Sequence, residues 1–596
     1  MSDMIDFAKR CYRFAHRHIH PEAYVDPNPF PIDAWGDTGY AAWFESHKTF
    51  DSELALQRGT WESFSVKPTF SFIVPLYKTS HEFLHTMADS VLRQTYPNLQ
   101  LVLVNASPDM ADLASEVERY RVRDERVTVV TLERNLGITE NTNKGLDASV
   151  GDFCCFLDHD DFIEPDLLFQ YVRALNDDPE IDVLYCDEDL VSRDEKTGTF
   201  RSEHVLFKGA LEPELLLCKN YIVHLMTVRR TLIDQMPLPD ARFDGAQDYN
   251  MVLYCTSHAR KVRNIQKVLY HWRISEASTA ANPDAKPYSR QAYRLAAAGE
   301  LERRVPFGRI IASGIVNVHN IWMDRDAAKT VSVLLAFDGD DRALERALEF
   351  LEQTNTARHA EVIICGPETD GFEDIARRRG AIRIVVPSQS RFVCWNEAAR
   401  RASGEHLLFM DASCTFNTPE PLEQLSALLT VDGVGVSAPK ILYRDGRNKS
   451  FGVAVTSARI MPLYRGYEDD FPGYECNLRA MHNVSAAGLQ GLCTPRALFE
   501  ELGGFDESFE GEIGAVDYCK RVRDAGYRVV VTPTVKLEVD EPAPELYYVH
   551  EVNAPDYTAS DLARFDAKWP GAREAGDPYF NRNLDQSSCY CQIPQE

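Results

Sequence analysis

The chain has 596 residues, too many for one ordinary hydrophobic core, so two to four domains are expected. Its composition, 44% hydrophobic and 26% charged, is typical of a globular protein and excludes a largely disordered one. The 91 acidic residues outnumber the 64 basic residues, and the net charge of −27 argues against a nucleic-acid-binding protein, whose contact surface should be basic.

Residues 1–66 show helical, amphipathic patterning with a basic start, "FAKRCYRFAHRHIH". Two interpretations stay open: the segment caps the first domain, or its cations rest on an anionic membrane surface. The sequence has no apolar run of about 18 residues and no signal-peptide core. We therefore expect a cytoplasmic protein, with peripheral contact to the inner face of the cell membrane as the open question.

Residues 67–284 alternate between predicted strands and predicted helices. The segments "FSFIVPLY", "LQLVLVN", "RVTVVTL" and "DFCCFLD" are typical of buried strands, and helical patterns such as "EFLHTMADSVLRQ" separate them. Strands that alternate with helices indicate a Rossmann-like, mostly parallel sheet with helices on both faces.

The same pattern returns in residues 329–545. There "TVSVLLAF" matches "FSFIVPLY", "AEVIICG" matches "LQLVLVN", and "HLLFMDAS" matches "FCCFLDHD". A repeat of this length indicates two homologous α/β domains. Residues 285–328 are then a linker with a helix in it, and residues 546–596 are a C-terminal tail.

An acidic turn, "DHDD" at residues 158–161, lies at the end of the fourth predicted strand of the first domain. Ligands of open parallel sheets bind beyond the carboxyl ends of the strands, which is where this turn lies. Clustered carboxylates repel one another unless a cation joins them, and Mg²⁺ or Mn²⁺ with a bound diphosphate suits such a site. For an isolated acidic turn, a solvated loop is the competing interpretation.

Three further segments strengthen the interpretation of a site. Asp248 in "FDGAQDY" opens a predicted helix, where it either reaches the cleft or stabilises the helix N-terminus. His271 in "YHWR" ends a predicted strand, where it either ligates a metal or packs among aromatic residues. The segment "LERNLGITENTNKG", which contains Asn135, is rich in residues that can meet a phosphate or a ribose.

A second acidic run, "YCDEDL", also follows a predicted strand. Its acids could contact the sugar or the acceptor, or they could be ordinary surface acids: Asp187, Glu188 and Asp189.

Taken together and in this chain order, the motifs resemble the inverting family 2 glycosyltransferases, which have a GT-A fold. The resemblance covers residues 68–280 and again residues 330–545. It implies two tandem GT-A domains, preceded by the helical N-terminal segment. The tail sequence "DPYFNRNL" also resembles bacterial surface-polysaccharide enzymes of the O-antigen type, which have two such domains.

The resemblance implies a role for each of the residues singled out. Asp248 would be the catalytic base, and Asp160 and His271 would bind Mn²⁺ or Mg²⁺. The donor nucleotide and sugar would contact Pro75, Tyr77, Asn105, Asn135 and Asp158. Further contacts to the sugar or acceptor would come from Asp187, Glu188, Asp189, Gln247 and Trp272.

The sequence departs from the family pattern at two positions. Asn105, in "VNASPD", stands where the family usually has an aspartate that reads the base. An amide both donates and accepts, so a UDP-linked and a dTDP-linked donor both stay open. Gln247 replaces the usual glutamate before Asp248.

The second copy lacks most of these groups. It keeps Asp411, which Ala412 and Ser413 follow, and it has Gly514 and Ala515 where the base would stand. A further difference is Val539, at the place of a metal-binding histidine. We therefore predict a catalytically silent domain that serves as a scaffold, an acceptor-binding surface or a dimer contact. Glu512 is a possible substitute base and keeps a bifunctional enzyme open.

The predicted function is metal-dependent, inverting transfer of a sugar from a nucleotide diphosphate sugar to a hydroxyl group. The acceptor would be a glycan or a lipid-linked glycan in surface-polysaccharide synthesis. The alternatives are a transferase with two active domains and a carbohydrate- or partner-binding pseudoenzyme. A nucleotidyltransferase also combines a nucleotide-binding sheet with an acidic metal site, but "QDY" and "HWR" after the acidic turn argue against it.

Overall fold

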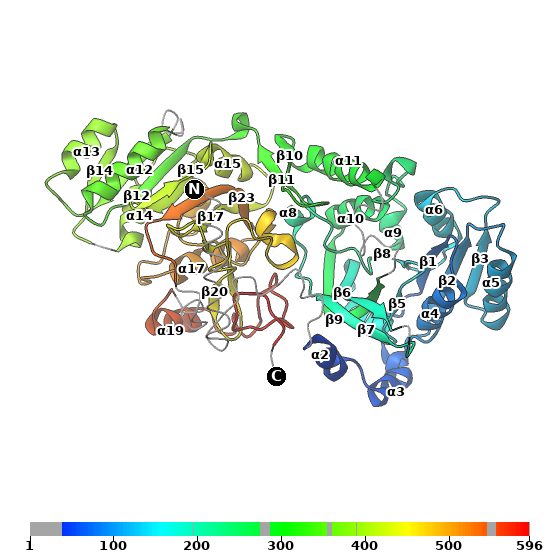
Figure 1. Cartoon of the computed structure of the whole chain (residues 1–596). Helices are drawn as coiled ribbons and strands as arrows, with labels where there is room; N and C mark the ends of the chain where they lie inside the picture. The colour runs from blue at the N-terminus through cyan, green and yellow to red at the C-terminus, as the bar shows by residue number, and fades with distance from the viewer. Residues whose placement is uncertain are drawn as a thin grey trace.

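The computed structural model describes residues 39–194, 196–274, 287–353, 360–388, 390–544 and 556–594. Two large mixed sheets, of nine and ten strands, follow one another along the chain, and each is flanked by helices (Figure 1). This arrangement confirms the predicted fold class of two tandem α/β domains. The basic start of the N-terminal segment lies outside the described residues.

The first sheet has the strand order β3-β2-β1-β4-β8-β6-β9-β5, with β7 paired to β6. The pairs β1–β2, β2–β3, β1–β4 and β6–β9 are parallel, and β8 is antiparallel to both of its neighbours. The strands β1 and β2 are buried along their whole length, as expected of parallel strands covered on both faces. The strands are β1 (Phe70–Leu76), β2 (Leu99–Asn105), β3 (Val127–Thr131), β4 (Phe153–Phe156), β5 (Phe162–Ile163), β6 (Ile181–Arg193), β7 (Phe200–Leu206), β8 (Thr227–Arg229) and β9 (Lys261–Arg273).

Amphipathic helices cover this sheet. In α4 the Ser80 hydroxyl caps the first turn by accepting the Phe83 N–H, and the buried residues recur at helical spacing: Leu84, Met87, Ala88 and Val91. The helices that matter for the site are α4 (His81–Leu92), α5 (Ala111–Arg123), α6 (Ile138–Ala148), α7 (Leu167–Asp177) and α10 (Gln247–His258).

Two N-terminal helices, α2 (Tyr40–His47) and α3 (Asp51–Thr60), lie against the first domain. The Tyr40 hydroxyl donates to Asp189 over 3.0 Å, and the Thr49 hydroxyl donates to Asp166 over 2.7 Å. For these residues the structure therefore shows the contact that the capping interpretation expects.

The second sheet repeats the first strand by strand, in the order β14-β13-β12-β15-β22-β17-β23-β16, with β18 paired to β17. The additional strand β21 (His482–Asn483) pairs with β23. The matching strands are β12 (Val331–Ala336), β13 (Ala360–Gly366), β14 (Ile382–Val385), β15 (His406–Asp411), β16 (Cys414–Phe416), β17 (Val434–Leu442), β18 (Asn448–Ser450), β22 (Leu492–Pro495) and β23 (Arg528–Val539). The predicted repeat is thus present in the topology, which makes equivalent positions in the two domains identifiable by register.

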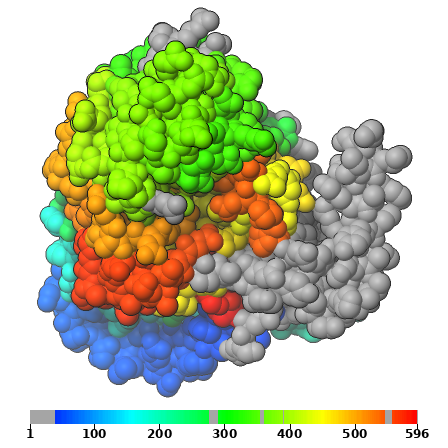
Figure 2. All heavy atoms as spheres, turned by 90° about the vertical axis from the view of Figure 1, so that its left-hand side faces the viewer, coloured from blue at the N-terminus to red at the C-terminus, as the bar shows by residue number. Residues whose placement is uncertain are grey.

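The linker contains the predicted helix, α11 (Pro287–Arg304), and a hairpin of β10 (Gly308–Ala312) and β11 (His319–Met323). The face in Figure 2 is formed mostly by the second domain, and the N-terminal part of the chain lies at its lower edge. None of the helices among the described residues is both long enough and apolar enough to cross a membrane.

Candidate active site

The acidic turn connects β4 to β5 at the carboxyl edge of the first sheet. Asp158 is 54% exposed in its side chain, whereas Asp161 is fully buried. The Asp161 carboxylate accepts hydrogen bonds from the Tyr270 hydroxyl and from the backbone N–H of Arg273, both on β9. The turn is therefore anchored at Asp161 and presents Asp158 to solvent.

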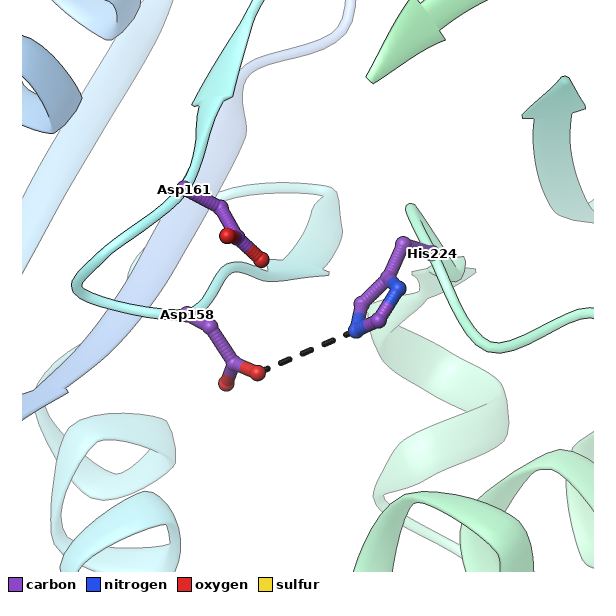
Figure 3. A group of neighbouring side chains, drawn as sticks. All are labelled: Asp158, Asp161 and His224. Carbon is purple, nitrogen blue, oxygen red and sulfur yellow. Dashed lines mark ion pairs between the residues drawn. The ribbon is translucent and has the colours of Figure 1, made fainter. Parts of the chain in front are cut away.

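A histidine from another part of the chain completes this cluster. One ligand atom from each of Asp158, Asp161 and His224 lies within 4.8 Å of the other two (Figure 3). The His224 Nε2 is 3.8 Å from Asp158 Oδ2, and its Nδ1 is 3.0 Å from the buried Glu188 carboxylate. The donor set, two carboxylates and one imidazole oriented by another carboxylate, fits Mn²⁺ or Mg²⁺.

Burial and neighbouring charges shift the pKa values of the groups in this cluster. Burial raises the pKa of Asp161 well above its usual range, and repulsion from Asp160 and Asp158 raises it further. Burial by itself would lower the pKa of His224, but the negative charges of Glu188 and Asp158 outweigh it and raise the pKa to about 10. A proton on His224 thus stabilises the acids, and a divalent cation would have to displace that proton.

His271 does not join the cluster in the structure. Successive side chains of β9 point to opposite faces, so Tyr270 reaches Asp161 while His271 faces away. The His271 ring nitrogens contact Asp189 Oδ1 at 2.6 Å and Glu164 Oε1 at 3.1 Å. Among the described residues, the metal-ligand group includes neither His271 nor Asp160, the two ligands that the resemblance implied.

Asp248 lies in the first turn of α10. The Asn220 side-chain amide donates to Asp248 Oδ2 over 3.2 Å. Burial raises the pKa of Asp248, and the charges of His224 and Asp158 act on it as well, so the three groups share one region. The neighbouring Gln247 accepts the Gly245 N–H through Oε1, and it thus stabilises the turn before the helix.

The residues predicted for the nucleotide lie along the same edge of the sheet. The strands β1 and β2 end side by side, with Pro75 opposite Val104. Asn105 Oδ1 accepts the Ser107 N–H, while Tyr77 just beyond β1 is 44% exposed. The predicted donor contact Asn135 accepts the Gly137 N–H and so shapes the turn before α6.

The three acids of the run "YCDEDL" in β6 are fully buried, so the interpretation of Asp187, Glu188 and Asp189 as surface acids is wrong. Each has a partner inside the protein. Glu188 contacts His224, Asp189 contacts His271, and Asp187 accepts hydrogen bonds from the Lys208 backbone and from the C-terminal tail. The neighbouring Trp272 packs edge-on against His224, at 5.1 Å between ring centroids.

Register identifies the equivalent of His224 in the second domain. His224 stands three residues before Thr227, which pairs with Cys155 of β4. In the second domain, Leu408 of β15 is equivalent to Cys155 of β4, and it pairs with Cys493 of β22. Gln490 stands three residues before Cys493, as His224 stands three residues before Thr227. Asp411 corresponds to Asp158 by the same register. In the second domain, therefore, an amide replaces the imidazole.

In the second domain Asp411 contacts protein donors, and the part of the chain that the structure describes forms no metal-ligand group around it. Gln490 donates to Asp411 Oδ2 over 2.7 Å, and Arg391 lies 3.2 Å from the same oxygen. At the predicted base position, a Cβ added to Gly514 would lie 2.2 Å from the Phe392 ring. Glu512 is half-buried, and its carboxylate accepts the Leu489 N–H over 2.9 Å.

Comparison with known proteins identifies the first domain. Residues 71–236 match the family model described as "Glycosyl transferase family 2". This region is a family 2 glycosyltransferase domain. The acidic turn, His224 and the surrounding strands β1 to β8 all lie within the matched glycosyltransferase region.

Two curated relatives match most of the chain. An uncharacterized protein y4gI of Sinorhizobium fredii is 29% identical over 537 residues, which are 87% of this chain and 58% of that protein. The O-antigen biosynthesis protein RfbC of Myxococcus xanthus is 26% identical over 538 residues, which are 89% of this chain and 41% of that protein. The chain thus spans about half the length of these relatives.

Solved structures of glycosyltransferases are among the structural matches. TarS 1–349 of S. aureus in complex with UDP-GlcNAc matches with a TM-score of 0.31 and 23% identity, over 39% of this chain and 66% of that one. The mannosyltransferase PcManGT of Pyrobaculum calidifontis, in complex with GDP-Man and Mn²⁺, matches with a TM-score of 0.29 and 17% identity, over 41% and 66% of the two chains.

Proposed function

We propose that the first domain transfers a sugar, with inversion, from a nucleotide diphosphate sugar to a hydroxyl of a glycan or lipid-linked glycan. One observation carries this proposal. At the carboxyl edge of the first sheet, the ligand group of Asp158, Asp161 and His224 lies in the same region as Asp248. The relative named as an O-antigen biosynthesis protein supports surface-polysaccharide synthesis as the setting. We place the reaction in the cytoplasm, with the membrane's inner face as a site of peripheral contact.

The Mn²⁺ or Mg²⁺ ion would be held by three ligands, Asp158, Asp161 and His224. Asp160 lies beside them in the acidic turn. A bound divalent ion would offset the negative charge that grows on the departing diphosphate. Asp158 is the most exposed of these groups, so we assign it the additional contact with the ribose or sugar. His224 takes the ligand role that the sequence resemblance gave to His271.

Asp248 is the proposed general base. As the acceptor oxygen attacks the anomeric carbon, its proton passes to the Asp248 carboxylate, and the bond from that carbon to the diphosphate oxygen breaks on the opposite face. Asn220 orients the carboxylate through its hydrogen bond to Oδ2. The products are an inverted glycoside, a nucleoside diphosphate and a protonated Asp248.

The donor nucleotide is assigned to the edge formed by β1 and β2. Pro75 and Tyr77 would line the base pocket, and Asn105 would contact the base edge. Because Asn105 Oδ1 is engaged by Ser107, its amide N–H groups are the natural contacts for a carbonyl of uracil or thymine. A UDP-linked or dTDP-linked sugar is therefore the proposed donor.

The second domain is proposed to be catalytically silent. Gln490 donates a hydrogen bond to Asp411, the site acid that the two domains share, and Arg391 offsets its charge. The Phe392 ring fills the space beside Gly514. The half-buried Glu512, which directly precedes α17 (Ile513–Asp524), is the observation that favours the competing proposal of a second active site.

The test is an assay of the purified protein with UDP-linked and dTDP-linked sugars and a glycan acceptor, in Mn²⁺, in Mg²⁺ and in excess EDTA. Release of nucleoside diphosphate that depends on acceptor and metal is expected. In a parallel assay with UTP or dTTP and a sugar 1-phosphate, formation of the nucleotide diphosphate sugar with release of pyrophosphate would instead indicate a nucleotidyltransferase. Binding of glycan with no turnover of any donor would indicate a pseudoenzyme, and full activity in EDTA would remove the metal from the proposal.

A further inference from the structure

The C-terminal segment returns from the second domain to the first. The backbone N–H of Ala210 donates to the Pro578 carbonyl over 2.7 Å. At Gly209 the approach is so close that an added Cβ would lie 2.8 Å from the Tyr579 carbonyl oxygen. The segment with the sequence "DPYFNRNL" therefore packs against the loop that follows β7.

Asn581 is the buried polar contact of this segment. Its side-chain amide donates to both carboxylate oxygens of Asp187, at 3.0 Å each, and to the Lys208 carbonyl at 2.8 Å. Asn583 adds a longer contact to Asp187, at 3.3 Å. Because Asp187 is fully buried, these donors replace water that the carboxylate has lost.

A continuous path of hydrogen bonds and ion pairs leads from Asp187 to the metal cluster. The Lys208 N–H donates to Asp187 Oδ1 over 2.9 Å, and its ammonium group donates to the His224 carbonyl over 2.5 Å. The same ammonium lies 3.3 Å from Glu188, whose carboxylate contacts the His224 ring at 3.0 Å. Both the backbone and the ring of His224 are thus held by groups that Asp187 positions.

We propose that Asn581 is a positioning residue for the metal cluster of the first domain, acting through Asp187 and Lys208; this inference rests on the function proposed above. Partners behind a metal ligand fix its orientation and tune its affinity. The C-terminal segment comes from beyond the silent domain, so the fold of that domain holds in place a part of the first domain's site.

Other contacts of the second domain reach the same stretch of chain. The Lys219 ammonium donates to the Glu475 carbonyl, and Arg528 lies 2.9 Å from Glu214. The stretch they hold runs directly into Asn220, which orients Asp248, and then into His224. Asn581, together with the longer contact from Asn583, joins this interface to the metal cluster through Asp187 and Lys208.

The experiment measures the affinity of the full chain for Mn²⁺, by electron paramagnetic resonance of the free ion, with saturating UDP or dTDP. Asn581→Ala should weaken Mn²⁺ binding roughly tenfold, at the lower end of the losses seen for outer partners of metal ligands. Arg582→Ala is the matched control, because its exposed side chain lies next to Asn581, and it should bind like the wild type. In an Asp187→Asn background, Asn581→Ala should add little further loss.

Thermal unfolding of each variant accompanies the measurement. Wild-type affinity in a folded Asn581→Ala protein would overturn this inference and leave the proposed function standing. Failure of the wild type to bind Mn²⁺ with either nucleotide would overturn both. If Asn581→Ala does not fold, Asn583→Ala takes its place, with a smaller loss of Mn²⁺ affinity expected and an unchanged affinity contradicting the inference.

Discussion

The two domains share one strand order, but the aspartates that follow their equivalent strands have different partners. In the first domain Asp158 faces His224, with Asp161 completing a group that suits a divalent cation. In the second domain the equivalent Asp411 faces Gln490 and Arg391, so protein donors already satisfy its charge. The comparison shows that one strand order carries different side chains at equivalent positions in the two domains.

The helix that follows shows the same contrast. Asp248 opens α10, while α17 (Ile513–Asp524) has Gly514 and Ala515 near its start. The Phe392 ring occupies the space that a side chain on Gly514 would need. The packing therefore leaves no room for a carboxylate at Gly514, and introducing one there would require the Phe392 ring to move.

The largest expected effect comes from the base of the first domain. Asp248→Asn should lower turnover by about 10²–10⁴-fold, because an amide keeps the shape of the side chain but cannot take the proton. Binding of UDP or dTDP with Mn²⁺, measured by calorimetry, should stay near normal. Glu512→Gln is the matched change in the second domain and should leave turnover intact; a comparable loss there would mean that the second domain is catalytic.

Two histidine variants separate the metal ligand from the structural residue. His224→Ala should weaken Mn²⁺ affinity by about 10–100-fold, a loss of the size seen in other metal sites when a partner of a metal ligand is removed. His271→Ala should instead lower the free energy of unfolding by about 3–5 kcal/mol, because it removes the imidazole that pairs with the buried Asp189 carboxylate and leaves that carboxylate with the Tyr40 hydroxyl. Mn²⁺ titration and chemical denaturation check both, and the reverse pattern would restore His271 as the ligand.

The pH dependence of turnover tests the environment of Asp248. A base must be deprotonated to act, and burial raises the pKa of Asp248. Turnover should therefore fall as the pH drops through a value above about 3.9, the ordinary value for an aspartate. The profile of kcat at saturating Mn²⁺ and donor measures this, and an acid limb at or below that value would contradict the proposed burial of the working base.

The smallest effect is expected in the second cleft. Asp411→Ala should leave the rate of sugar transfer almost unchanged, because Gln490 and Arg391 already engage the Asp411 carboxylate. Asp158→Ala, at the equivalent register position, should abolish metal-dependent transfer. Equal losses in the two variants, with both proteins folded, would show that the two clefts work together.

Much of the fold was predictable because it depends on local pattern. Buried apolar strands that alternate with helices, and their return after residue 329, predict both sheets. The acidic turn and Asp248 were also accessible, since each lies at the end of a predicted strand or at the start of a predicted helix. These features need no knowledge of which distant segments meet.

The remaining parts of the site depend on tertiary contacts. His224 lies in "NYIVHLMTVRR", which has no metal-binding spacing, and it reaches Asp158 only because β8 pairs with β4. His271 has the expected motif, but the alternation of β9 turns it toward Asp189. The contact between Asn581 and Asp187 joins distant parts of the chain and leaves no local trace in the sequence.

The most direct test of the central claim counts binding sites in the full chain. Calorimetry with Mn²⁺ and either UDP or dTDP should give one nucleotide and one metal site per chain. Binding should be lost in Asp158→Ala and retained in Asp411→Ala. Two sites per chain, or loss of binding in a folded Asp411→Ala protein, would contradict the assignment of all metal-dependent chemistry to the first domain.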